Sequence, residues 1–155
     1  MTHSPSSIDT ALTSAVEELK SRLVNLAEEW VREQDAAAAT TVDKSQLRLL
    51  LQAARSEPLP VTSNLLRYQI GRDNGFYGSA SHRNRGRHAR VGQRLLDLLE
   101  TTLPELAREG IAGDAARSEL ERELATHFFG YVLREHTYMQ AVVKERGRRD
   151  RGGNR

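Results

Sequence analysis

Apolar residues in positions 8–33 recur with a 4-3-4-3-4 spacing, and this repeat restricts the segment to an α-helix with one apolar face. The apolar face consists of Leu12, Val16, Leu19, Leu23, Leu26 and Trp30. Ser7 or Asp9 can cap the start of the helix, because a side-chain oxygen there accepts a hydrogen bond from a free backbone amide. A helix of this kind takes most of its stability from tertiary packing, so the chain must supply partner helices.

Further helices are predicted along the rest of the chain. They cover approximately residues 43–56, 62–70, 87–101, 104–110 and 114–146. Pro58 and Pro60 separate the second helix from the third, because proline lacks an amide donor and favours extended backbone before it. Gly71 suits the carboxyl cap of the third helix, and residues 101–104 predict a break after the fourth. The pattern leaves open whether the alanines at 36–39 continue or end the first helix.

The composition agrees with a helical fold and indicates which residue types fill the core. Hydrophobic residues make up 38% of the 155 residues and aromatic residues 5%, so leucine, valine and alanine must fill most of the core. Leucine and alanine favour helices, and no segment shows the alternation of a strand. We therefore predict an all-α fold, a small helical bundle of about five to six helices with a basic Gly/Arg-rich loop. Residues 1–145 would form the domain and residues 146–155 a basic, disordered tail.

The location expected for the protein is the cytoplasm. The chain contains no cysteine, which excludes disulfides and thiolate metal sites and fits a reducing compartment. Residues 1–9 show no basic segment followed by an apolar run, so no signal peptide is expected. No apolar stretch approaches the roughly 20 residues that span a bilayer, so we expect no membrane partner.

A net charge of +2 conceals strongly segregated charges. Residues 1–35 carry three bases and seven acids, and residues 95–143 carry four bases and nine acids. Residues 72–94 carry six arginines and one acid, and residues 144–155 carry six bases and two acids. Such segregation builds strong local potentials. The negative segment of one copy could meet the positive segment of the next, which would produce head-to-tail stacking of copies.

The arginine- and glycine-rich segment from Arg67 to Arg94 predicts a nucleic-acid contact. A guanidinium presents a planar fork of donors that fits a phosphate, and glycine lets the backbone approach a ligand closely. Phe76 and Tyr77 offer ring faces on which bases can stack. This combination favours RNA over an acidic protein partner.

Two short motifs precede and enter that segment. Ser45-Gln46-Leu47-Arg48 is followed by Leu50 and Leu51, and Tyr68 is followed by Gly71-Arg72-Asp73. Together they resemble the small helical subunit of type III (Csm-type) CRISPR effector complexes, and the aromatic-rich last helix is similar too. The resemblance covers roughly residues 41–145.

The resemblance implies a non-enzymatic subunit without a cofactor. It would contact the backbones of guide RNA and target RNA, other CRISPR effector subunits and stacked copies of itself. Arg48 and Arg72 would face RNA, with Lys44 and Arg67 nearby. The charge pattern extends this set of RNA-binding candidates by Arg83, Arg85, Arg87, Arg90 and Arg94. Tyr68 is expected to pack in the interior.

Two other classes of function remain open. Residues 83–88 fit the Arg-polar-x-x-x-His pattern of helical HEPN ribonucleases, and Arg122 and His127 have the same spacing. A DNA-binding or scaffold module is the third possibility, although the proline-containing turn at 56–61 differs from that of a helix-turn-helix. The five histidines form no metal-ligand pattern, and packed or surface positions are expected for His127 and His136.

Overall fold

The computed structural model of the chain describes residues 6–36, 42–72 and 85–153, with the backbone alone for residues 34–36 and 85–90. All regular structure in these ranges is helical, which confirms the predicted all-α bundle. The elements are α1 (Ser7–Ala36), α2 (Lys44–Ser56), α3 (Leu59–Gly71), α4 (Arg85–Asp97), a π-helical turn η2 (Leu98–Thr102), α5 (Leu103–Gly110) and α6 (Asp114–Gly152). None of the described helices is long and apolar enough to cross a membrane.

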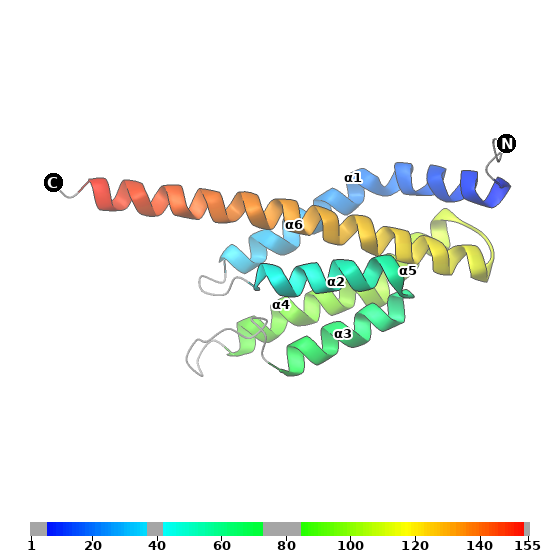
Figure 1. The fold of residues 1–155 in the computed structure, drawn as a ribbon, viewed down its shortest axis with the longest axis horizontal. Helices are drawn as coiled ribbons and strands as arrows, with labels where there is room; N and C mark the ends of the chain where they lie inside the picture. The colour runs from blue at the N-terminus through cyan, green and yellow to red at the C-terminus, as the bar shows by residue number, and fades with distance from the viewer. Residues whose placement is uncertain (1–5, 37–41, 73–84, 154–155) are drawn as a thin grey trace.

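The long helix α6 lies at the centre of the bundle and packs against α1, α2, α3 and α5 (Figure 1). Its most extensive contact is with α1, so the first and last helices of the chain pack together. Phe128 and Phe129 are both fully buried, and their rings meet edge to face with centroids 5.3 Å apart. Neighbouring helical residues point about 100° apart, so burial of both rings requires cover over a wide arc of α6.

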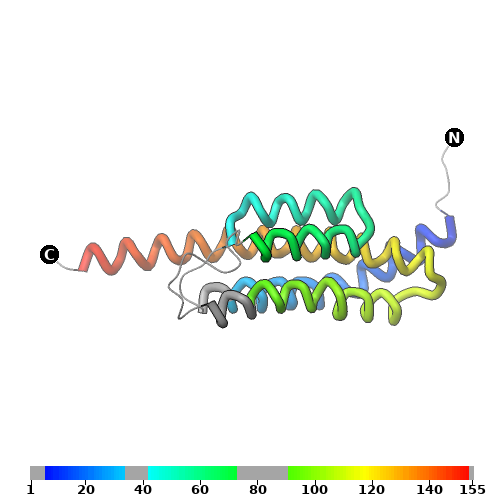
Figure 2. Tube along the Cα trace, turned by 90° about the horizontal axis from the view of Figure 1, so that it is seen from below, coloured from blue at the N-terminus to red at the C-terminus, as the bar shows by residue number. Residues whose placement is uncertain are grey.

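The course of the chain brings several helix ends together. Helices α1 and α6 run in the same direction, α2 runs back along α6, and α3 returns beside α2 (Figures 1 and 2). The amino ends of α2 and α4 therefore lie near the carboxyl ends of α1 and α3. We call residues 42–48, 69–72 and 85–91 at this end of the bundle the basic end. The last turns of α6 project past it (Figure 2).

Two long-range hydrogen bonds fix the helices at the basic end. The indole Nε1 of Trp30 in α1 donates to the carbonyl oxygen of Val91 in α4, at 3.0 Å. The Nε2 atom of His136 in α6 lies 3.0 Å from the carbonyl oxygen of Val42, directly before α2. Trp30 and His136 are each 2% exposed, so both bonds are shielded from water. They join segments distant in sequence and hold the start of α2 and the start of α4 on the bundle.

The boundaries of α3 differ from the prediction at both ends. The helix already begins at Leu59, with Pro60 in its first turn. Proline is tolerated there, because the backbone amides of the first turn have no hydrogen-bond partner within the helix. Leu59 is 3% exposed, and its burial favours the early start. The predicted glycine cap is wrong, because Gly71 is the last helical residue and has no positive φ. Arg72 is the cap residue instead, with φ −86° and ψ 0°.

The break predicted at residues 101–104 is also wrong. Thr102 and Leu103 keep right-handed helical backbone, and the chain passes from α4 to α5 through η2. The amide of Leu103 donates to the carbonyl of Leu98, five residues earlier. Pro104 supplies the physical reason, since its ring would clash with the carbonyl four residues before it in a regular α-helix. A wider π turn avoids this clash without ending the helix.

The carboxy-terminal segment differs from the expected disordered tail. Helix α6 continues to Gly152, well past Arg146. Lysine, arginine and glutamate are good helix formers, and Glu145 and Arg149 form an ion pair at the favourable spacing of four residues. The expected burial of Tyr68 is wrong as well, and Tyr138, on the apolar side of the last helix, is also exposed. Tyr68 is 56% exposed and Tyr138 is 61% exposed.

Candidate nucleic-acid interface

The amino end of α2 presents two cations on its outer side. Asp43 caps the helix by accepting a hydrogen bond from the amide of Ser45 at 3.2 Å. Leu47 is fully buried, so the helix is held with Arg48 exposed and Lys44 half-buried. These two side chains are four residues apart and share one face. Among the described residues, neither pairs with a carboxylate.

Arg72, at the carboxyl end of α3, is oriented by an aromatic side chain. Its Nη1 donates to the hydroxyl of Tyr68 at 2.7 Å, and its guanidinium carbon lies 5.5 Å from the centroid of the same ring. The hydrogen bond from Arg72 to Tyr68 raises the pKa of Arg72, and a guanidinium is in any case always charged. A guanidinium has five N–H donors, and those not used by Tyr68 remain for a phosphate. Exposed Tyr68 thus positions Arg72 rather than filling the core.

Two further arginines of the predicted set are already paired with carboxylates. Both oxygens of Glu100 accept hydrogen bonds from Arg67, at 2.7 and 2.7 Å from Nη2, and Nε donates to one of them at 2.9 Å. Arg94 forms an ion pair with Glu33 of α1. A phosphate would have to displace these carboxylates. Arg67 therefore links α3 to η2, and Arg94 links α4 to α1.

The other four predicted RNA-binding residues carry less structural information. Arg83 lies outside the described residues, as do Phe76 and Tyr77. Arg85, Arg87 and Arg90 lie in the first turns of α4, whose backbone places them at the basic end. The structure thus brings the start of α2, the end of α3 and the start of α4 together, although 41 positions separate Lys44 from Arg85.

His136 is a residue of this region that the sequence did not single out. It was expected only to be packed or on the surface, and no motif indicated its contact with Val42. Burial is the main influence on its pKa and lowers it, and the positive charge of Lys44 acts in the same direction. The hydrogen bond with Val42 and the charge of Asp43 oppose the shift. Neutral His136 thus holds the start of α2, from which Lys44 and Arg48 project.

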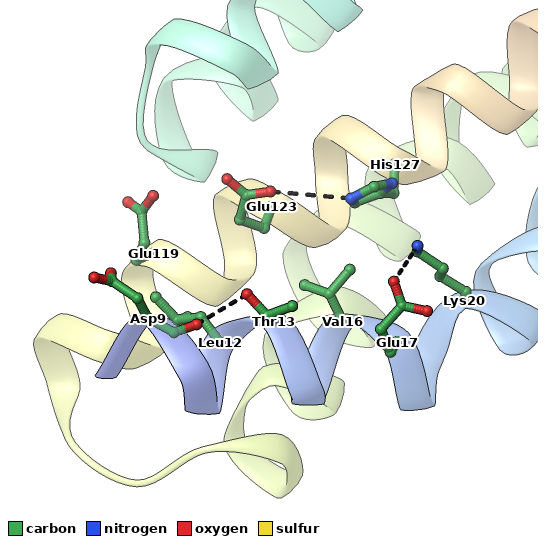
Figure 3. A pocket seen from close by; sticks show the side chains of 9 residues that line it. All are labelled: Asp9, Leu12, Thr13, Val16, Glu17, Lys20, Glu119, Glu123 and His127. Atoms are coloured by element: carbon green, nitrogen blue, oxygen red, sulfur yellow. Dashed lines mark hydrogen bonds and ion pairs between the residues drawn. The ribbon is translucent and has the colours of Figure 1, made fainter. Parts of the chain in front are cut away.

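A groove of about 310 Å³ lies between α1 and α6, toward their amino ends (Figure 3). Leu12 and Val16 are among its apolar lining residues, and its acidic lining residues are Asp9, Glu17, Glu119 and Glu123. His127 Nε2 lies 4.0 Å from a carboxylate oxygen of Glu123. In the described part of the chain, no group of three or more acidic or histidine side chains could hold a metal ion. Three of these carboxylates already have a cationic partner, because Glu17 pairs with Lys20 and both Glu119 and Glu123 pair with Arg122. The groove offers a nucleic acid no unpaired cation among its lining residues.

Arg122, the basic member of one possible ribonuclease pair, is engaged in contacts within the protein. It forms ion pairs with Glu119 and Glu123 and donates to the backbone carbonyl of Arg55. The hydrogen bond from Arg122 is the main cause that lowers the pKa of Glu119, which keeps that carboxylate charged. Arg122 is therefore a link between α6 and α2, already neutralised by its partners. The other pair, within residues 83–88, has no described side chains.

Comparisons with known proteins give no relative for this chain: no family model, no curated protein and no solved structure matches it.

Proposed function

We propose that the protein is a non-catalytic, RNA-binding subunit of a type III CRISPR effector complex, and that its basic end contacts the RNA backbone. One observation carries the proposal. Arg48 and Arg72, the basic residues of the two motifs that resemble the small subunit, both lie exposed at the same end of the bundle. Neither pairs with a carboxylate in the described residues, so both are free to meet a phosphate.

The distribution of charge supports the same assignment. The acidic groove lies toward the amino ends of α1 and α6, away from the basic end (Figures 1 and 3). An RNA strand would be attracted more strongly to the basic end, where Arg48 and Arg72 are unpaired with carboxylates among the described residues, than to the end that holds the groove. The acidic region would then face neighbouring protein subunits or stacked copies. RNA-dependent growth of assemblies in sedimentation experiments would support stacking, and a monomer at all concentrations would argue against it.

Phosphate contacts predict binding that depends on salt and little on sequence. Replacement of Arg48 and Arg72 by alanine should remove two contacts. For a single-stranded RNA, the slope of log affinity against log salt should fall by about 1.4, since each phosphate contributes about 0.7. The affinity at low salt should fall on the order of tenfold. Fluorescence anisotropy with a labelled single-stranded RNA, over a salt series, measures both quantities.

A double variant of Arg55 and Arg108 is the matched control. Both are exposed arginines outside the basic end, and the change in net charge is the same. Arg55 also lies on the same face of α2 as Arg48, seven residues or about 10 Å further along. Equal losses in the two double variants would refute a contact specific to the basic end. Cleavage of the RNA, abolished by His88→Ala, would replace the non-catalytic proposal with the ribonuclease alternative.

A further inference from the structure

The end of α6 is an isolated helical arm with no partner among the described residues. Every residue from Lys144 to Gly152 is exposed, and the helix projects past the basic end (Figure 2). Most of the charge on this arm is positive: five bases and two acids lie in residues 144–152. A helical arm differs from a disordered tail in one important respect, because it holds its side chains in a fixed order around an axis.

The helical arrangement separates the charges onto different sides of the arm. Lys144, Arg148 and Arg151 are four and three residues apart, so they form one stripe on the helix surface. Glu145 lies about 100° away from Lys144 and pairs with Arg149 on another side, at 3.7 Å. In the described part of the chain, no carboxylate pairs with a member of the stripe. We call Lys144, Arg148 and Arg151 the basic stripe.

The basic stripe continues toward the amino end of α2. His136 marks the side of α6 that contacts Val42, directly before Lys44. Gln140 is one turn further along α6, and Lys144 one turn beyond that, each step rotating about 40° and rising about 6 Å. The stripe therefore begins two turns beyond the point where α6 holds the start of α2. Lys144 is thus about 80° around α6 from the side of His136 and about 12 Å further along the helix. Lys44 and the first member of the basic stripe lie at the same end of the bundle.

We propose that the basic stripe is a second contact for the RNA backbone, so that one strand passes from the basic end along the arm of α6. This inference rests on the proposed function and extends it to a site that the sequence motifs do not include. Three cations in a row over about 10 Å of helix suit a ligand with a regular row of negative charges. Gly147, between Lys144 and Arg148, has open space where a Cβ would lie, so a strand can approach the backbone there.

The test compares two double variants of the full-length protein that change the net charge equally. Lys144→Ala with Arg148→Ala removes two members of the basic stripe. Arg146→Ala with Arg149→Ala removes two arginines from other sides of the same arm. We expect the stripe variant to bind a labelled single-stranded RNA on the order of tenfold more weakly at low salt, with a salt slope lower by about 1.4. The control variant should lose less than about threefold, through long-range attraction alone.

The outcomes separate this inference from the proposed function. Equal losses in both variants, or no loss in either, would overturn the basic stripe, while the Arg48 and Arg72 variant would still report on the basic end. A wild-type protein that binds no RNA would overturn both. Binding of polyglutamate is the last measurement of the experiment. If polyglutamate binds as tightly as RNA and is equally weakened in the stripe variant, the stripe recognises acidic chains in general and the assignment to RNA is wrong.

Discussion

Gln69 is a buried side chain whose polar atoms have no partner among the described residues, and its replacement by methionine should stabilise the protein. It lies on the inner side of α3 and is 2% exposed, and within the described part of the chain neither its amide nitrogen nor its amide oxygen forms a hydrogen bond. A buried polar group without a partner costs about 1–3 kcal/mol. Methionine has a similar length and shape, and its helix propensity is close to that of glutamine. Gln69→Met should therefore raise the free energy of unfolding by about 1–3 kcal/mol.

Urea unfolding followed by circular dichroism measures this gain directly. The midpoint should rise while the slope of the transition stays constant, because the surface exposed on unfolding is nearly unchanged. In thermal unfolding, about 2–4 °C per kcal/mol for a chain of this size gives a Tm increase of about 2–12 °C. Gln52→Met is the control, since Gln52 is exposed on α2 and its change should leave stability within about 0.5 kcal/mol. A Gln69→Met variant no more stable than this control would refute the argument that the amide is unsatisfied.

Two further substitutions test His136 and Arg67, which lie outside the basic end but next to it in the fold or the sequence. Burial lowers the pKa of His136 in the folded protein, so as the pH falls below about 6.5 the unfolded chain takes up the proton first and stability falls. His136→Gln keeps a donor for the Val42 carbonyl and removes the titratable group. When the pH is lowered from about 7.5 to about 5.5, the Tm of the variant should fall less than the Tm of the wild type. An equal fall in Tm would contradict the role of His136. Arg67→Ala should change RNA affinity by less than about twofold, because Glu100 already occupies the guanidinium. If anisotropy shows a loss as large as that of Arg48→Ala, Arg67 exchanges its carboxylate for a phosphate.

Much of the fold was predictable because local chemistry determines it. The spacing of apolar residues predicted the bounds of α1 and α2 to within a few residues. A helix with one apolar face has to turn that face toward the core, so the spacing alone locates the helix. On α2 the burial of Leu47 leaves its neighbour Arg48 on the exposed side of the helix. The errors arose where tertiary contacts or backbone crowding outweighed a local signal. Residues 101–104 continue as a helix because the π turn accommodates Pro104.

The candidate site was predictable only in its residue types. The sequence indicated which arginines are available, but only the structure shows that Glu100 neutralises Arg67 from 33 positions away and that Glu33 pairs with Arg94. Local periodicity carries no information about such partners, because ion pairs between helices depend on how the helices are packed. For the same reason, the contact of His136 with Val42, 94 positions away, had no sequence signal.

The sequence by itself determined that this protein is helical, where most of its helices lie and which segments carry each charge, because these properties depend on residues within one or two turns of each other. The tertiary structure decided which charges remain free and where they gather. Packing around α6 brings the starts of α2 and α4 to the end of α3, and it leaves the last turns of α6 projecting beside them. Those relations depend on contacts between residues far apart in the chain, which no local pattern specifies.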